Sequence, residues 1–170
     1  MPIRSDIRQL AELSEVFIET GTLMGEGIAC AVAAGFGKIV SMELSDEHAK
    51  RVDFMFVGLV EAGVLQLLRG DCLELLPPVI AELDASGGRA TFWLAADHVK
   101  TLYPSLDLIA GAARNDHVIL IDDVRIMGKQ AANIELDEVI RRLREINPDY
   151  LITREMGYQP EDVIMALPAR

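Results

Sequence analysis

Five short, almost uninterrupted apolar runs lie between residues 16 and 121, and stretches with helical periodicity separate them. Runs without apolar–polar alternation are typical of strands that are buried on both faces of a sheet. Because these runs alternate with helices, the pattern predicts a mostly parallel sheet with helices on both sides. The expected strands cover residues 16–19, 38–43, 64–68, 91–94 and 118–121.

The last part of the chain has a different pattern. Residues 136–146 form the clearest amphipathic helical stripe in the sequence. Two further strand-like runs, 150–155 and 162–167, are joined by a short loop, so they must be antiparallel. We therefore expect a single α/β domain over residues 1–170, with a doubly wound sheet of seven strands that ends in an antiparallel hairpin.

The earlier helices are expected between the strands. Ser45 is a plausible N-cap for a helix that Gly63 closes. A second helix is expected over residues 72–83 and a third over residues 105–113.

Composition excludes several classes of partner. The chain has 16 Lys and Arg against 27 Asp and Glu, a net charge of −11, which argues against nucleic acid as the main partner. No apolar run reaches the ~18 residues that span a bilayer, and the amino terminus lacks a signal-peptide core. Cys30 and Cys72 form no CxxC motif. We expect a soluble, cytoplasmic domain that binds neither membrane nor nucleic acid.

Acidic residues follow every predicted parallel strand. In an open parallel sheet, ligands bind at the carboxyl ends of the strands, near the point where the strand order reverses. Solubility alone would scatter carboxylates over helix surfaces, so their position at one edge predicts a ligand site there. The residues concerned are Glu19-Thr20-Gly21-Thr22, Glu43, Gly70-Asp71-Cys72, Ala95-Ala96-Asp97-His98 and Asp122-Asp123.

The loop after the first strand is rich in glycine. Gly21, Gly25 and Gly27 let the backbone turn sharply and approach a ligand closely, although a tight turn without a ligand explains them as well. Their spacing matches neither the dinucleotide fingerprint nor the P-loop. Glu19 would repel a pyrophosphate, so a cationic or zwitterionic ligand suits this loop better.

Glu43 ends the second strand ~20 residues after the glycine loop, where an acid can accept both hydroxyls of a ribose. The other interpretation is a surface acid at a strand end, or a partner of the next helix cap. Asp71 can accept from an adenine amino group, and it is equally suited to cap the helix that follows, which is compatible with ligand contact.

In this order and spacing, ETGTLMGEG, Glu43, GDC and the terminal hairpin resemble the class I S-adenosylmethionine-dependent methyltransferases. The resemblance covers the chain from strand one to the hairpin. It implies a Rossmann-like sheet whose last strand is antiparallel and lies between the fifth and sixth strands. It also implies S-adenosylmethionine as cofactor, with Glu19 and Gly21 near its methionyl part, Glu43 at the ribose, and Asp71 and Cys72 beside the adenine. The cofactor-binding residues expected are Glu19, Thr20, Gly21, Thr22, Glu43, Leu44, Gly70, Asp71, Cys72 and Ala95.

The segments TFWLAADH and VILIDDVR look like those of a subgroup in which the fifth-strand Asp-Asp pair holds a divalent metal. Asp122 and Asp123 are therefore candidate Mg²⁺ ligands, with Asp97 as a third, because hard cations prefer several oxygen ligands. The pair would otherwise cap the segment after the strand. Ala95 departs from the subgroup, which has an aspartate there.

The implied reaction is methyl transfer to a small-molecule acceptor with a hydroxyl group. A hydroxyl must lose its proton, and Asp97 or His98 is the candidate base, although His98 is equally well explained as an ordinary loop residue. Two alternatives stay open: a binding protein that has lost catalysis, and an NAD-dependent oxidoreductase. Because no long insertion is available as a lid, either a large acceptor supplies its own cover or the second subunit of a homodimer closes the site.

Overall fold

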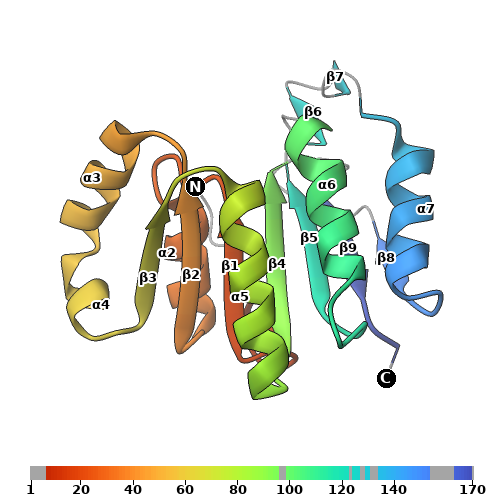
Figure 1. The fold of residues 1–170 in the computed structure, drawn as a ribbon, viewed down its shortest axis with the longest axis horizontal. Coiled ribbons are helices and arrows are strands. Elements are labelled where there is room, and N and C mark those ends of the chain that lie inside the picture. The colour runs from red at the N-terminus through yellow and green to blue at the C-terminus, as the bar shows by residue number, and fades with distance from the viewer. Residues whose placement is uncertain are drawn as a thin grey trace.

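The computed structural model describes residues 7–95, 99–122, 124–126, 129–130, 134–153 and 163–169. A seven-stranded sheet forms its centre, with the strand order β3-β2-β1-β4-β5-β9-β8 (Figure 1). The strands are β1 (Val16–Thr20), β2 (Lys38–Glu43), β3 (Leu65–Arg69), β4 (Ala90–Ala95), β5 (Val118–Asp122), β8 (Leu151–Thr153) and β9 (Ile164–Leu167).

The pairing confirms the fold class expected from the sequence. Strands β1 to β5 are parallel to one another, while β9 is antiparallel to both β5 and β8. The last strand therefore lies between the fifth and the hairpin's first strand, as the resemblance implied. The chain runs outward from β1 to β3 and returns at β4, so the strand order reverses between β1 and β4.

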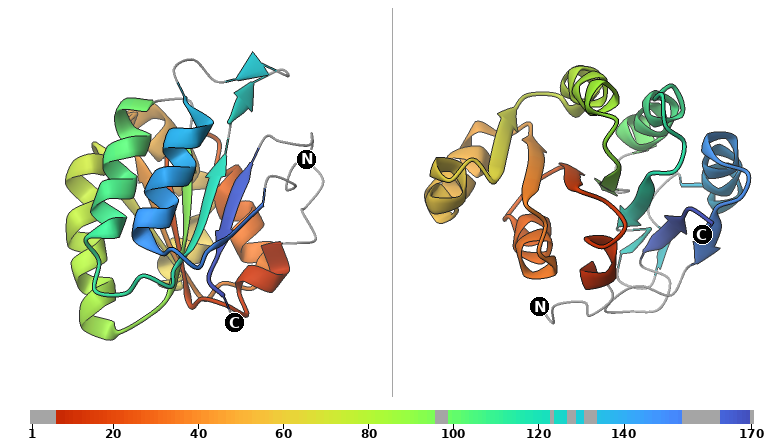
Figure 2. Two further views of the ribbon diagram at one scale, coloured as in Figure 1. Left: turned by 90° about the vertical axis from the view of Figure 1, so that its right-hand side faces the viewer. Right: turned by 90° about the horizontal axis from the view of Figure 1, so that it is seen from below.

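Helices cover both faces of this sheet. Figure 2 shows α5, α6 and α7 on one face and α1 and α2 on the other, while α3 and α4 lie at the β3 end. Their bounds are α1 (Ile7–Leu10), α2 (Glu26–Ala34), α3 (Asp46–Met55), α4 (Val57–Glu61), α5 (Cys72–Ser86), α6 (Val99–Ala110) and α7 (Leu136–Ile146). None of the helices in the described part of the chain is long and apolar enough to cross a membrane.

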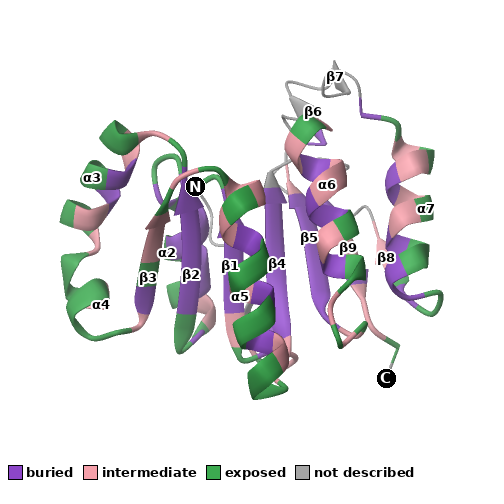
Figure 3. Ribbon diagram, in the orientation of Figure 1, coloured by how far each residue is buried: buried purple, intermediate pink, exposed green. Residues whose placement is uncertain are grey.

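Successive side chains of each strand point to opposite faces of the sheet, so they belong to two separate apolar cores. Ile18 of β1 packs with the α5–α7 layer, and Phe17 packs with the α1–α2 layer and with Trp93. Strands β1, β2, β4 and β5 are largely buried (Figure 3), which is why their sequences read as continuous apolar runs. Because side chains alternate along a strand, Glu19 lies on the same face as Phe17, the face that α2 covers.

The helix predicted up to Gly63 is broken in two. It begins at the Ser45 cap as expected but stops at Phe56, after which α4 forms a separate short helix. The Phe56 ring lies against Gly25, because a Cβ built on Gly25 would be 2.5 Å from its Cε2 atom. Packing against the glycine loop accompanies this break, which periodicity could not reveal.

The structure corrects one further prediction and adds one element that the sequence did not indicate. Helix α6 begins at Val99, six residues before the predicted start at 105, and contains Pro104. Leu102, which precedes Pro104, is buried on the same helix as Leu106 and Ile109. Packing of these side chains in the core therefore stabilises the helical turn before the proline. A small hairpin, β6 (Arg125–Ile126) with β7 (Lys129–Gln130), was not predicted, because two-residue strands carry no periodicity.

His117 immediately precedes β5, at the amino ends of the parallel strands, and it is fully buried. Its Nδ1 accepts a hydrogen bond from the Ala90 amide at 3.2 Å, and its ring meets Phe92 edge to face. Tyr150 donates from Oη to the His117 carbonyl at 2.7 Å. Burial lowers the pKa of His117, which keeps its Nδ1 free to accept.

Candidate functional site

The loop between β1 and α2 makes the sharp turn predicted from its glycines. Gly21 and Gly25 have φ angles of 84° and 80°, in the left-handed region that favours glycine. The Gly21 and Thr22 amides both donate to the Met42 carbonyl, at 2.9 and 3.2 Å. The loop is therefore fixed to the end of β2, and Gly21 remains exposed beside it.

Glu19 is buried beneath this loop, with 3% of its surface exposed. Its Oε2 accepts a 2.5 Å hydrogen bond from the hydroxyl of Ser41, its direct neighbour across the β1–β2 pair. Gly27 of α2 lies against the other oxygen, because a Cβ there would be only 1.7 Å from Glu19 Oε1. The absence of a side chain at Gly27 thus makes room for the carboxyl group.

The environment of Glu19 favours its neutral form. Burial raises its pKa to about 8, and the negative charges of Glu43 and Asp122 act in the same direction, against the hydrogen bond from Ser41. Three acids on three strands, β1, β2 and β5, therefore lie close enough to interact. This convergence at the carboxyl edge was predicted from the strand-end acids.

Glu43 is held rigidly at the end of β2. One carboxylate oxygen accepts from the Leu23 amide and the other from the Ser45 amide, both at 2.8 Å. His48 Nδ1 is 3.8 Å from Oε1. An ionised carboxylate has about four acceptor positions, and the two amides occupy two of them. The Glu43 side chain is otherwise largely buried, with 8% of its surface exposed.

The end of β3 lies next to Glu43. Gly70 has a φ of 141°, and its amide donates to the Glu43 carbonyl at 2.9 Å. Asp71 is exposed and caps α5, because its carboxylate accepts a hydrogen bond from the Leu73 amide at 2.9 Å. The sequence interpretation of Asp71 as a helix cap is therefore confirmed. Cys72 is half-buried, and burial raises the pKa of its thiol.

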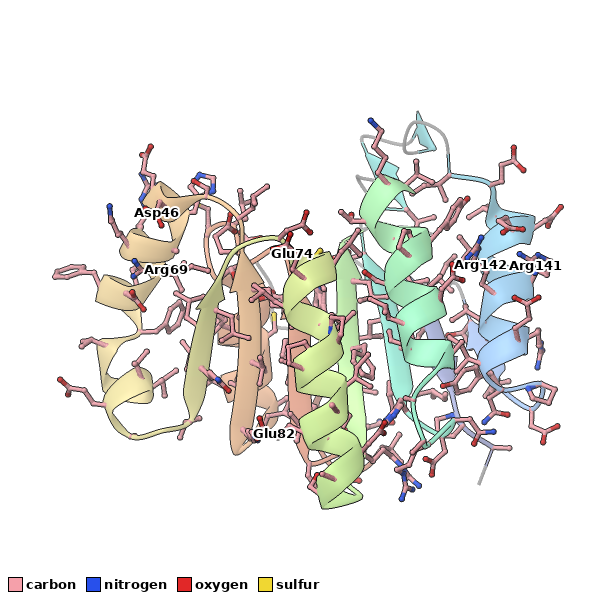
Figure 4. All side chains as sticks on the ribbon, in the orientation of Figure 1. Asp46, Arg69, Glu74, Glu82, Arg141 and Arg142 are labelled. Atoms are coloured by element: carbon pink, nitrogen blue, oxygen red, sulfur yellow. The ribbon has the colours of Figure 1, made fainter. Side chains whose placement is uncertain are left out.

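Further acids surround this edge of the sheet. Figure 4 shows Asp46, at the start of α3, and Glu74, in the first turn of α5, toward the carboxyl edge, while Glu82 lies toward the opposite edge. Glu82 is paired there with Lys38 at 2.8 Å. At the carboxyl edge, Asp46 Oδ2 lies 3.8 Å from Lys50 Nζ on the same helix.

The other predicted residues divide into two groups. Thr20 is buried, Leu44 is 76% exposed, and Ala95 is the last residue of β4, opposite Asp122 in the β4–β5 pair. Asp97, His98 and Asp123 lie outside the described residues, so their roles stay predictions. Among the residues that the structure describes, no group of three or more His, Cys, Asp or Glu side chains is arranged to hold a metal ion.

Two residues of the site were missed in the sequence. Ser41 was passed over inside the run KIVSME, although a polar residue within a buried strand is itself a signal that it has a partner. Leu23 contributes through its backbone amide alone, and its φ of 48° is unusual for a residue with a side chain. Nothing in its side chain could have indicated this role.

Comparisons with known proteins give matches at the level of structure only. No family model matches the chain, and no curated protein matches its sequence. A methyltransferase from Geobacter sulfurreducens has a TM-score of 0.66 at 13% identity, covering 96% of this chain and 76% of that one. Rv0187 from MTB, in a cofactor-bound structure, has a TM-score of 0.56 at 25% identity, covering 95% and 78%.

An O-methyltransferase from Bacillus cereus, in complex with S-adenosylhomocysteine, is also similar. Its TM-score is 0.63 at 19% identity, with 96% of this chain and 79% of that chain covered. These likenesses extend over nearly the whole chain and agree with the observed strand order, including the antiparallel last strand. The chain therefore has the fold of the class I S-adenosylmethionine-dependent methyltransferases.

Proposed function

We propose that this protein is an S-adenosylmethionine-dependent methyltransferase that acts on a hydroxyl group of a small molecule. The observation that carries the proposal is Glu43, whose carboxylate is fixed by two backbone amides beside the glycine loop. A carboxylate fixed in this way is pre-organised, so a ligand that donates two hydroxyls meets little ordering cost. The matched solved structures of methyltransferases support the same class.

The residues at this edge fit the parts of the cofactor. Glu43 would accept from the ribose hydroxyls with the acceptor positions that the Leu23 and Ser45 amides leave open. Gly21, exposed at the turn, lets the backbone approach the ligand, and the carboxylate form of Glu19 would attract the cationic group of the methionyl part. Asp71 and Cys72 would border the adenine.

This arrangement suits S-adenosylmethionine better than NAD. A pyrophosphate needs a glycine cradle with positive potential, but the charges that act at this loop are the negative charges of Glu43 and Asp122. The loop also lacks the dinucleotide spacing of glycines. The oxidoreductase alternative therefore has no support from the site.

The cofactor supplies a methyl group activated by a positive sulfur. The chain's own task is to orient the acceptor in line and to remove the proton of its hydroxyl. Asp97 or His98, following β4, would accept that proton. Asp122 and Asp123 are the residues that would hold Mg²⁺, a hard cation that prefers oxygen ligands, including those of a substrate. The structure of an O-methyltransferase from Bacillus cereus supports oxygen as the atom that is methylated.

Calorimetric titration with S-adenosylmethionine, S-adenosylhomocysteine and NAD tests the cofactor. We expect binding of the first two and a loss of at least about tenfold in affinity for Glu43→Ala, since hydrogen bonds to a charged group contribute ~1.5–3 kcal/mol. Glu61→Ala, an exposed acid on α4, is the matched control and should bind normally. Absence of binding at millimolar ligand, or tighter binding of NAD, would contradict the proposal.

A screen for methyl transfer to small hydroxylated acceptors tests the reaction. Asp97→Ala and His98→Ala should lower turnover without changing cofactor affinity, and chelation with EDTA should lower it if Asp122 and Asp123 hold Mg²⁺. Cofactor binding without transfer to any acceptor would favour the alternative of a binding protein, to which Ala95 lends weight because the subgroup has an acid there.

Light scattering tests the expected homodimer.

A further inference from the structure

Ser41 is a buried polar residue in the middle of a strand, between the apolar Val40 and Met42, and it is 0% exposed. A hydroxyl in such a place needs partners, because an unsatisfied buried group is costly. Ser41 has two: it donates to Glu19 Oε2, and its Oγ lies 2.5 Å from Thr22 Oγ1. It therefore connects the acid at the end of β1 with the glycine loop.

This connection continues into the backbone. The Thr22 hydroxyl also lies within hydrogen-bond distance of the Met42 carbonyl, at 3.2 Å, the same carbonyl that binds the Gly21 and Thr22 amides. Each hydroxyl has only one proton to donate. When Glu19 is ionised, Ser41 donates to it and Thr22 can donate to Ser41; when Glu19 is protonated, it can itself donate to Ser41. The directions of these hydrogen bonds thus follow the charge of Glu19.

We propose that Ser41 is a positioning residue of the site, which holds the Glu19 carboxyl under the glycine loop and makes its ionised form easier to reach. Ser41 need not touch any ligand to do so. Its effect on ligand binding, though not on the ionisation of Glu19, rests on the proposed function.

The surroundings of Glu19 leave this role to Ser41. Glu43 from β2 and Asp122 from β5 face it with negative charges, which disfavour its ionised form. Helix α2 contributes Gly27 and β4 contributes Trp93, neither of which is charged. Among the described residues that act on Glu19, Ser41 is thus the one whose hydrogen bond favours the carboxylate.

A consequence for binding follows from linkage. A ligand that places an ammonium group beside Glu19 binds better to the carboxylate than to the neutral acid, so its binding releases a proton and strengthens as the pH rises. S-adenosylhomocysteine carries such an ammonium group, whereas 5′-methylthioadenosine has the adenosine part without it. Their affinities should therefore depend differently on pH.

The first experiment needs no ligand. The carboxyl carbon of Glu19 is followed by ¹³C NMR during a pH titration, with Glu19→Gln to assign the signal. Ser41→Ala should raise the titration midpoint by about one pH unit or more, as expected for loss of a hydrogen bond to the charged form. Ser41→Thr keeps the hydroxyl and should stay near the wild type, and Ser105→Ala, at a buried serine of α6, is the matched control. An unchanged midpoint in Ser41→Ala would overturn the proposal.

The second experiment measures binding by calorimetry between about pH 6 and about pH 8.5, a range that includes the ionisation of Glu19. In the wild type, affinity for S-adenosylhomocysteine should rise across the Glu19 midpoint, and in Ser41→Ala that rise should move to higher pH. Affinity for 5′-methylthioadenosine should be flat in both. A rise at the same pH in both proteins would refute the role in binding.

The outcomes separate this proposal from the proposed function. If the wild type binds neither ligand but Ser41→Ala still moves the Glu19 midpoint, the cofactor assignment is wrong and the positioning role is supported. If the wild type binds both and the midpoint does not move, the cofactor assignment stands and the positioning role is refuted. Should Ser41→Ala fail to fold, Ser41→Cys, with its weaker donor, should give a smaller shift in the same direction.

Discussion

Glu19 should make the folded protein less stable as the pH rises, and Glu19→Gln should remove this dependence. Burial holds the pKa of Glu19 at about 8 in the folded chain, whereas an exposed glutamate in the unfolded chain titrates near ~4.3. Between these values the folded state binds one more proton than the unfolded state. The contribution of Glu19 is therefore complete below the unfolded pKa, falls by about 1.4 kcal/mol per pH unit, and is lost above the folded pKa.

Urea unfolding at several pH values between about 5.5 and 8.5 measures this effect. Trp93 is the single tryptophan of the chain, and as a buried core residue it provides a fluorescence signal. The free energy of unfolding of the wild type minus that of Glu19→Gln should decrease by ~3 kcal/mol over these three pH units, because the slope flattens as the pH passes the folded pKa of about 8. Glu61→Gln, at an exposed acid, should give a difference that does not change with pH. Parallel curves for the wild type and Glu19→Gln would refute the reasoning.

Three more measurements follow from the same contacts. Gly25→Ala should destabilise the fold by about 2–4 kcal/mol, because its φ of 80° and the Phe56 ring both oppose a Cβ, whereas Gly37→Ala, in open space, should cost far less. Below about pH 6.5 the wild type should lose up to about 1.4 kcal/mol of unfolding free energy per pH unit, since His117 takes up a proton in the unfolded chain but resists it when buried. His117→Gln should not show this loss, and urea unfolding at two pH values checks both the slope and its sign. Glu43→Gln should weaken S-adenosylhomocysteine and 5′-methylthioadenosine equally in calorimetry, because both carry the ribose.

The order and character of the apolar runs predict the sheet and the edge at which its acids lie. Continuous apolar runs indicate strands that are buried on both faces, and a short connection between two runs allows only an antiparallel pair. Parallel strands share one carboxyl edge, so residues such as Glu19 and Glu43, each at the end of its strand, had to lie at that edge. These are local patterns, and periodicity or position in the chain is enough to recognise them.

The environment of each acid, by contrast, depends on contacts between segments that are far apart in the chain. Glu19, Glu43 and Asp71 look alike in sequence, yet one is buried against α2 and holds its proton up to about pH 8, one is fixed by two amides, and one is an exposed helix cap. Their differences come from groups distant in sequence, above all Ser41 and Gly27. Burial and hydrogen bonding depend on how helices and strands pack, and that packing sets both the charge of a carboxyl group and the positions it has left for a ligand.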